Sequence, residues 1–258
     1  SRRSAGSEVL DLHCHLLPGV DDGSRTVEQS VGVLERLRLQ GYAGLCLTPH
    51  LLASRTGAGV PQRHAAAFEK LTASAPLGIR LYRGAEVMLD RPLEARVAEE
   101  RLITLNRTRY LLVEFPRLVL ATTVEQALRR VVELGLVPLV AHPERYVCCR
   151  VATAAHWKSL GALLQVDGPT LISTRTRGER ARQLLAAGLA DILAADNHGD
   201  DRSLHPVRTA LLRKDGATQA RLLLEENPAR ILDDGPVTEV PPLAWKVTML
   251  DRLRSLWP

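Results

Sequence analysis

The chain is organised as short apolar segments that alternate with longer amphipathic ones. Seven apolar segments are too short to be helices, and glycine, proline or polar residues bound most of them, as is typical of buried strands. These predicted strands are 9–12, 45–48, 79–83, 110–113, 137–141, 163–166 and 192–195. The amphipathic segments predict helices at 26–40, 62–72, 123–134, 152–160, 177–187, 207–214 and 218–226.

This alternation indicates an α/β fold with a parallel sheet, because continuous apolar strands are buried on both faces by the intervening helices. Thr26, Thr123 and Thr176 each precede Gln or Glu by three residues, a pattern that marks helix starts. About seven strand–helix units favour a closed or nearly closed barrel over an open sheet. In such barrels, catalytic residues lie at the carboxyl ends of the strands.

Composition excludes several classes of protein. The chain is 45% hydrophobic and 24% charged, so it has enough apolar surface to fold. No apolar run approaches the roughly 18 residues of a membrane span. The net charge is +5, but the arginines that carry it are scattered and accompany no nucleic-acid-binding motif. We therefore expect no nucleic-acid partner.

The ends of the chain and its cysteines indicate a cytoplasmic domain with short extensions. Residues 1–7 are polar, so we expect a disordered lead or a cloning remnant rather than a signal peptide. Residues 8–232 carry the strand–helix pattern, and 233–258 are expected to form a mainly helical extension, with an apolar side from Leu243 to Trp257. The four cysteines lack metal-type spacing, so we expect reduced thiols.

Imidazole or carboxylate side chains follow six of the seven predicted strands. Burying such groups at the end of an apolar strand is costly unless something neutralises them, so their repetition predicts a shared cation cluster. Histidine and carboxylate ligands without cysteine suit Mn, Fe or Zn, and nine ligands are enough for two or three ions. The nine candidates are His13, His15, Asp22, His50, Glu86, Glu114, His142, Asp196 and His198.

Other residues near these strand ends have predicted supporting roles. Arg145 lies three positions after His142, where its planar guanidinium would bind a phosphate group. Asp11 and Asp21 are expected to orient or support the ligands. The segment 51–60 follows His50 and is rich in small and polar residues, so it is expected to form a mobile flap over the site.

The ordered motifs resemble those of one bacterial enzyme family. They are DLHCHLLPGVDDGS at 11–24, TPH at 48–50, GAEV at 84–87, VEF at 113–115, AHPER at 141–145, ADNH at 195–198 and NPARIL at 227–232. Together they resemble the metal-dependent protein-tyrosine phosphatases of the polymerase and histidinol phosphatase (PHP) superfamily. This CpsB/CapC-like family accompanies the tyrosine kinases of capsule and exopolysaccharide synthesis.

The resemblance implies a distorted TIM-like (β/α)7 barrel with a three-metal centre, most simply of manganese. It implies that His13, His15, Glu86 and Asp196 hold one metal, and that Glu86 bridges to a second metal held by Glu114 and His142. Asp22, His50 and His198 would hold the third. Arg145 and Arg202 would bind the phosphate while a metal-activated hydroxide attacks phosphorus.

The implied substrate is the phosphorylated Tyr-rich tail of a bacterial tyrosine kinase, which would bring the enzyme close to the membrane, and an oligomer is possible. Two alternatives stay open at this point. One is a PHP phosphoesterase for a small phosphorylated metabolite, which a closed, deep pocket would favour over an open rim. The other is a non-catalytic PHP binding module, which a complete ligand set argues against.

Overall fold

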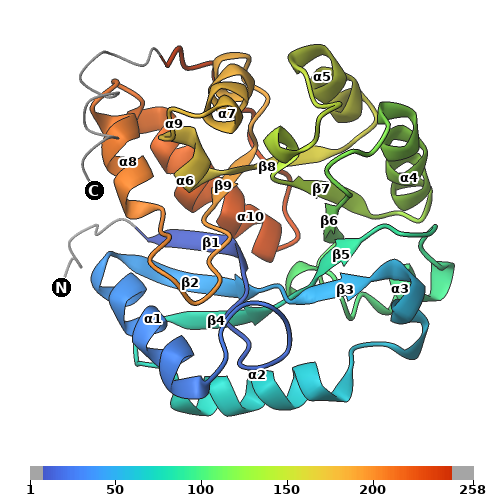
Figure 1. Ribbon diagram of the computed structural model, residues 1–258, viewed down its shortest axis with the longest axis vertical. Helices are drawn as coiled ribbons and strands as arrows, with labels where there is room; N and C mark the ends of the chain where they lie inside the picture. The colour runs from blue at the N-terminus through green and yellow to red at the C-terminus, as the bar shows by residue number, and fades with distance from the viewer. Residues whose placement is uncertain (1–7, 246–258) are drawn as a thin grey trace.

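The computed structural model describes residues 8–245 (Figure 1). The expected lead 1–7 lies outside the described residues, as does most of the apolar side of the expected C-terminal helix. The strands in the described part are β1 Val9–Cys14, β2 Tyr42–Leu47, β3 His50–Leu52, β4 Arg80–Arg83, β5 Glu86–Met88, β6 Tyr110–Glu114, β7 Val137–Ala141, β8 Leu163–Asp167 and β9 Ile192–Ala194.

Helices connect these strands and lie outside them. The longer ones are α1 Val27–Leu39, α2 Gln62–Ser74, α4 Ala121–Glu133, α5 Val151–Ser159, α7 Thr176–Ala186 and α8 His205–Leu212. The shorter ones are η1 Ala53–Ala58, α3 Ala95–Glu100, η2 Leu105–Arg107, η3 Pro143–Arg145, α6 Gly168–Leu171, α9 Ala217–Arg221, η4 Leu222–Glu226 and α10 Asn227–Leu232. Within the described range, no helix combines the length and apolar character that crossing a bilayer requires.

All strand pairings are parallel, and they form two sheets in the orders β1-β2-β4 and β3-β5-β6-β7-β8-β9. The sheets meet where two strands bend: Pro49 separates β2 from β3, and Gly84–Ala85 separates β4 from β5. Backbone bonds continue across the bend, from the Gly84 amide to the Leu47 carbonyl at 3.1 Å and from the Glu86 amide to the Pro49 carbonyl at 3.1 Å. The nine strands therefore correspond to seven barrel positions.

The ring closes between β1 and the end of β9. The His15 amide donates to the Asn197 carbonyl at 2.7 Å, and the Asp196 amide donates to the His13 carbonyl at 3.1 Å. The buried Asp11 carboxylate accepts from the Ala195 amide across the same junction at 3.1 Å. Burial raises the pKa of Asp11 to about 7. The predicted distorted (β/α)7 barrel is confirmed.

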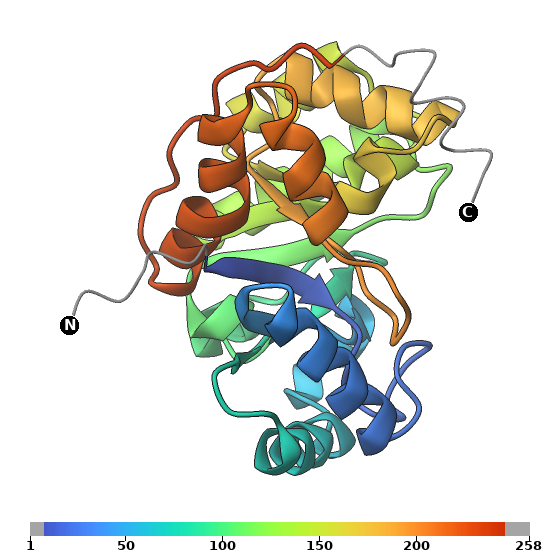
Figure 2. The same cartoon turned by 90° about the vertical axis from the view of Figure 1, so that its left-hand side faces the viewer.

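The helices bury one face each against the barrel wall. Figure 1 shows α4, α5, α7 and α8 around the upper part of the molecule and α1 and α2 along its lower edge. In Figure 2, β1 lies between α1 and the orange to red helices of the C-terminal third. Strand β1 is buried along its whole length, so its outward residues pack under helices and its inward residues face the barrel interior.

The predicted strands and long helices are present, and the differences lie in short elements. Helices α3, α6 and α10 were not predicted, because four to six residues show too little periodicity. Only Thr26 of the three threonines caps its helix, accepting from the Gln29 amide at 3.2 Å. Helix α4 begins two residues before Thr123, and α7 begins at Thr176 itself. Residues 236–245 of the expected helical extension have no helical conformation.

Asn227 at the start of α10 joins the C-terminal segment to the barrel. Its side-chain amide donates to the carbonyls of Asp191 at 2.9 Å and Thr238 at 2.8 Å. Its side-chain oxygen accepts from the Thr238 amide at 2.9 Å. The residue is fully buried, so no water can replace these bonds.

We predict that Asn227→Ala lowers the free energy of unfolding by about 2–4 kcal/mol, because it leaves the buried Asp191 carbonyl and two half-buried backbone groups of Thr238 without their partners. Gln183→Ala, on the exposed side of α7, is the control and should change it by less than about 0.5 kcal/mol. Urea unfolding monitored by circular dichroism measures both values. Equal stabilities for the two variants would contradict this role of Asn227.

Candidate metal centre

The carboxyl ends of the strands bring all nine predicted ligands to one rim of the barrel. Their donor atoms form four overlapping groups within which all atoms lie no more than 4.8 Å apart. The groups are His13–Glu86–His142, His13–His15–Asp196, His50–Glu86–Glu114 and His15–Asp22–His50–His198. The overlap means that the residues form one continuous cluster rather than separate sites.

Glu86, the first residue of β5, lies at the centre of the cluster. Its Oε2 is 3.2 Å from His13 Nε2, 3.3 Å from His15 Nε2 and 3.0 Å from His50 Nδ1. Its Oε1 is 2.8 Å from His142 Nε2. A carboxylate whose two oxygens face different imidazoles is placed to bridge two ions.

Asp196 and the more exposed ligands complete the cluster. Asp196 Oδ1 lies 3.3 Å from His13 Nε2 and 3.4 Å from His15 Nε2. Asp22 Oδ1 lies 3.3 Å from His50 Nε2 and 3.5 Å from His198 Nε2. His13, Glu86 and Asp196 are buried, whereas the side chains of Asp22, His50 and His198 are partly exposed. The exposed residues therefore lie at the entrance of the cluster.

The donor spacing fits metal ions. Ligands bonded to one ion at about 2.0–2.2 Å lie about 3.0–3.5 Å from each other, as many of these donors do. His13 Nε2 and His15 Nε2 face each other at 3.1 Å. Three buried atoms of the cluster have no hydrogen-bond partner in the described structure: Glu86 Oε2, Asp196 Oδ1 and His142 Nδ1. Unpaired buried groups are costly, and a cation shared by Glu86 and Asp196 would remove much of that cost.

The charge balance also fits cations. Burial alone would raise the pKa of Glu86, yet the neighbouring imidazoles hold it well below its usual range. Burial alone would lower the pKa of His50, but the adjacent carboxylates of Glu114 and Glu86 raise it to about 10. The pKa of His15 is likewise raised, by Asp196, Asp21 and Glu86 against the effect of burial. The carboxylates therefore attract positive charge, which divalent ions would supply.

Surrounding groups orient the ligands. Asp21 Oδ2 lies 2.8 Å from His15 Nδ1, as predicted for a supporting carboxylate. Gln165 Oε1 lies 2.8 Å from His13 Nδ1, so Nε2 of both histidines is directed into the cluster. His142 and Asp196 have left-handed backbone conformations, with φ of 32° and 50°. Such conformations are uncommon for residues other than glycine and often occur at functional sites.

Two arginines lie beside the cluster. Arg145 pairs with Asp196 and lies 3.4 Å from Asp167 Oδ2, and Arg202 binds the same Asp167 oxygen at 2.6 Å. Arg202 also donates to the Ala195 carbonyl at 2.9 Å. Both side chains are about one-third exposed, so their remaining N–H groups are accessible from solvent. Asp167 thus holds two guanidinium groups side by side.

Sequence reasoning missed Asp167 and Gln165. Asp167 is the last residue of β8, which was the one predicted strand not assigned a functional side chain at its end. For the other six strands, the functional residue was sought directly after the predicted strand. The same search after 163–166 would have identified Asp167. Gln165 points into the barrel at the alternate position of that strand, but a buried glutamine is not specific enough to be found from sequence.

The candidate ligands form overlapping groups that share members. Glu114 Oε1 lies 3.1 Å from His50 Nδ1, so Glu114 is grouped with His50 and Glu86 rather than with His142. His15 is shared between the group containing Asp196 and the group at the entrance. Glu86 belongs both to the group with His142 and to the group with Glu114, so the assignment of Glu114 and His142 to one metal, which the resemblance implied, stays a prediction.

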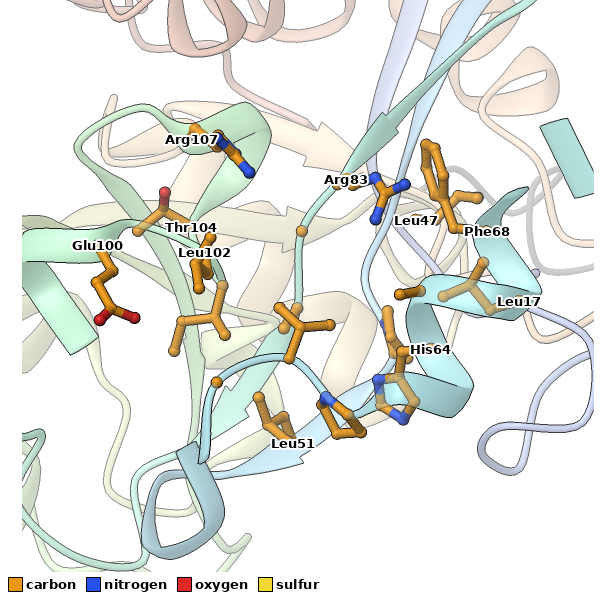
Figure 3. Close-up of a pocket in the computed structure, with 18 of the residues that line it drawn as sticks. Leu17, Leu47, Leu51, His64, Phe68, Arg83, Glu100, Leu102, Thr104 and Arg107 are labelled. Carbon is orange, nitrogen blue, oxygen red and sulfur yellow. The ribbon is translucent and has the colours of Figure 1, made fainter. Parts of the chain in front are cut away.

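Two hollows adjoin this rim. The first is an open groove of about 660 Å³, whose lining includes His50, Glu114, Leu52, Met88 and the start of α2. The second is a cavity of about 360 Å³ behind the bend in the barrel wall (Figure 3). Figure 3 shows Leu47 and Phe68 on one side of that cavity and Leu102 on the other. The segment 51–60, expected to be a flap, folds as β3 and η1 and contributes to both hollows.

Comparison with known proteins places the chain in a family. The profile of the family described as "Capsular polysaccharide synthesis, CpsB/CapC" matches residues 9–233. The chain belongs to the CpsB/CapC family. This match covers all nine candidate ligands, both arginines and Asp167.

Members of the CpsB/CapC family among the similar proteins are tyrosine phosphatases. Tyrosine-protein phosphatase YwqE of Bacillus subtilis is 26% identical over 247 residues, which cover 91% of this chain and 95% of YwqE. Tyrosine-protein phosphatase CpsB of Streptococcus pneumoniae is 25% identical over 243 residues, which cover 88% of this chain and 99% of CpsB.

Solved structures agree with the fold. A structure from a study of YwqE and CpsB, described there as unique metal-dependent tyrosine phosphatases, matches with a TM-score of 0.76 and 25% identity. The match covers 92% of this chain and the whole of the chain in the solved structure. The phosphotriesterase of Mycobacterium tuberculosis matches with a TM-score of 0.54 at 16% identity, covering 90% of this chain and 96% of its own, which shows similarity of fold alone.

Gly23 offers a test of how the loop after β1 positions Asp22. A Cβ atom at Gly23 would lie 2.0 Å from the His15 carbonyl oxygen, so the loop would have to move. We predict that Gly23→Ala weakens manganese binding by about 10-fold or more, as loss of ligand support usually does. Isothermal titration of metal-stripped protein measures the affinity.

Gly32→Ala is the matched control, because nothing lies within 4 Å of its added Cβ in α1. It should leave manganese affinity unchanged and stabilise the protein by about 0.5–1 kcal/mol, since alanine favours helix. Unchanged affinity in Gly23→Ala would contradict the proposed constraint on this loop.

Metal binding itself should stabilise the fold. We predict that adding manganese to stripped protein at about 100 times its dissociation constant raises the melting temperature by about 5–10 °C, because one such site contributes about 2.7 kcal/mol. Differential scanning calorimetry measures the shift. Calcium is the control, because it prefers sites built from oxygen ligands alone. An equal shift with both ions would contradict a histidine-rich site.

Proposed function

We propose that this protein is a metal-dependent phosphatase that hydrolyses phosphotyrosine in protein substrates. The observation that carries the proposal is the adjacency of nine metal-type ligands and two arginines at one barrel rim. Metal ions and guanidinium groups together are suited to bind and polarise a phosphate. Membership of the CpsB/CapC family and similarity to YwqE and CpsB support the same reaction.

The nine ligands would hold two or three divalent ions, with Glu86 bridging. When bound, the ions supply Lewis acidity, neutralise phosphate charge and lower the pKa of a coordinated water. We propose manganese, while the donor set also suits iron or zinc. The protein keeps the ligands in place through Asp21, Gln165 and the backbone of the strand ends.

Arg145 and Arg202 would bind the non-bridging phosphate oxygens through their accessible N–H groups. Because Asp167 contacts both side chains, the two guanidiniums are oriented before substrate arrives. That preorganisation favours the transition state, in which charge on these oxygens must be stabilised. The leaving phenolate has a pKa of about 10 in its free form, so it departs more readily than a serine alkoxide.

The cysteines do not support a thiol-based phosphatase mechanism. Cys14 and Cys46 are fully buried, and burial raises the pKa of both thiols. Burial also raises the pKa of Cys149 to about 12 and raises that of Cys148. A nucleophilic cysteine needs a lowered pKa and access to the substrate. The reaction therefore depends on the metal rim.

Access to the rim favours a protein substrate over a small metabolite. The side chains of Asp22, His50 and His198 are 69%, 37% and 27% exposed. The adjoining groove is open rather than a deep enclosed pocket, so a tyrosine on a peptide can present its phosphate to the rim. A tyrosine kinase of capsule assembly, modified on a Tyr-rich tail in the cytoplasm, is the substrate we propose.

We predict that metal-stripped protein is inactive on a phosphotyrosine peptide and that added manganese restores phosphate release. His142→Ala should lose activity because a ligand is removed, and Arg145→Ala should lower kcat/KM by about 10²–10³-fold. Arg150→Ala, an exposed arginine before α5, is the control and should behave as wild type. Malachite green detection of phosphate measures these rates.

Activity that survives in metal-stripped protein or in His142→Ala would contradict the metal mechanism. Turnover of sugar phosphates with no action on the peptide would instead favour a metabolite phosphatase. Manganese bound without turnover of either substrate would favour the non-catalytic binding module.

A further inference from the structure

The open groove beside the metal centre has a positively charged wall that the phosphatase reaction itself does not use. His50 and Glu114, which belong to the metal centre, line it together with Arg55 and Arg63. Leu52 and Met88 give it apolar contact surface. From this lining we infer that Arg55 and Arg63 bind an acidic side chain next to the phosphotyrosine of a peptide substrate. This inference rests on the proposed function.

Arg55 and Arg63 differ from the two arginines of the rim in having no partner. Arg145 and Arg202 are each paired with a buried carboxylate. Arg55, in η1, and Arg63, in α2, are exposed, and the side chain of neither makes an ion pair or hydrogen bond within residues 8–245. Their charges are therefore available to a ligand, whereas those of the rim arginines are already directed at the phosphate site.

The start of α2 strengthens this positive charge. Arg63 is the second residue of the helix, whose first turn contains no acidic residue and whose N-cap, Pro61, makes no side-chain hydrogen bond. The positive end of the helix dipole and the guanidinium therefore add together instead of being compensated. An anion in the groove would interact favourably with both.

The opposing charge in the groove is already engaged. Glu114 lies at the rim end, but its Oε1 is held 3.1 Å from His50 Nδ1 within the metal cluster. His64 is buried, and its pKa is lowered by burial and by the charge of Arg63, so it adds little positive charge. His50 and Glu114 place the groove next to the phosphotyrosine and its metals, while Arg55 and Arg63 make its lining suit a second negative charge.

A peptide with its phosphotyrosine at the rim can reach Arg55 and Arg63, because both line a groove that borders the rim. An extended chain advances about 3.3–3.6 Å per residue, so a side chain one to three residues from the phosphotyrosine can enter the groove. Leu52 and Met88 would contact the backbone and aliphatic parts of the peptide. The ligand is thus an anionic peptide side chain, either a carboxylate or a second phosphate.

The test is binding of non-hydrolysable phosphotyrosine-mimic peptides to the manganese-loaded protein, measured by fluorescence anisotropy. One peptide has glutamate at the three positions on each side of the mimic, a second has glutamine there, and a third has a second phosphotyrosine mimic. We predict that wild type binds the glutamate peptide at least fivefold more tightly than the glutamine peptide, and less so at high salt.

The double variant R55E/R63E should lose this preference or reverse it. R177E is the matched control, because Arg177 is also exposed and also the second residue of a helix, α7, but lies outside the groove. It should keep the wild-type preference. The third peptide distinguishes the two ligand sources: tighter binding than the glutamate peptide would favour a second phosphate.

An absence of preference in wild type, or a preference retained in R55E/R63E, would overturn the inference. Hydrolysis of 4-nitrophenyl phosphate by wild-type protein with manganese is measured in parallel. Loss of peptide preference with that turnover intact rejects only the groove. Failure of turnover with the preference intact rejects the proposed reaction and leaves the anionic groove standing.

Discussion

The structure depends on a cluster of carboxylate and imidazole groups that cannot all form hydrogen bonds with one another. Glu86 faces four histidines, and its Oε2 still lacks a hydrogen-bond partner. Neighbouring elements keep this arrangement in place: Asp11 joins β1 to the end of β9, and Gln165 fixes His13. A fold that maintains such an arrangement at the cost of buried, unpaired groups is organised around cations.

The barrel also separates charges by position. Carboxylates and imidazoles converge inside the rim, Asp167 holds Arg145 and Arg202 at its edge, and Arg55 and Arg63 lie in the adjoining groove. This order suits a phosphorylated peptide, whose phosphate needs metals and guanidiniums and whose flanking residues meet unpaired arginines. Arginines that are scattered in the sequence thus lie at two distinct places in the fold, the edge of the rim and the adjoining groove.

Much of the fold and of the candidate site was predictable because both depend on local patterns. Short apolar strands followed at once by His, Asp or Glu gave the barrel and eight of the nine candidate ligands, and Asp22 came from the DDG motif. The bends at Pro49 and Gly84 were not predictable as breaks between sheets, because backbone pairing continues across them. The partners of Glu114 and Arg202 depend on contacts between distant strands, such as that with Asp167, which periodicity does not encode.

Anomalous diffraction from crystals of the manganese-loaded protein, recorded at the manganese absorption edge, locates the bound ions directly. We predict two or three anomalous peaks at the rim. Each peak should lie within bonding distance of donor atoms from one of the four donor groups, and Glu86 should contact two of the peaks. A map without peaks at the rim, with Glu86 and Asp196 still contacting only protein side chains, would contradict this prediction.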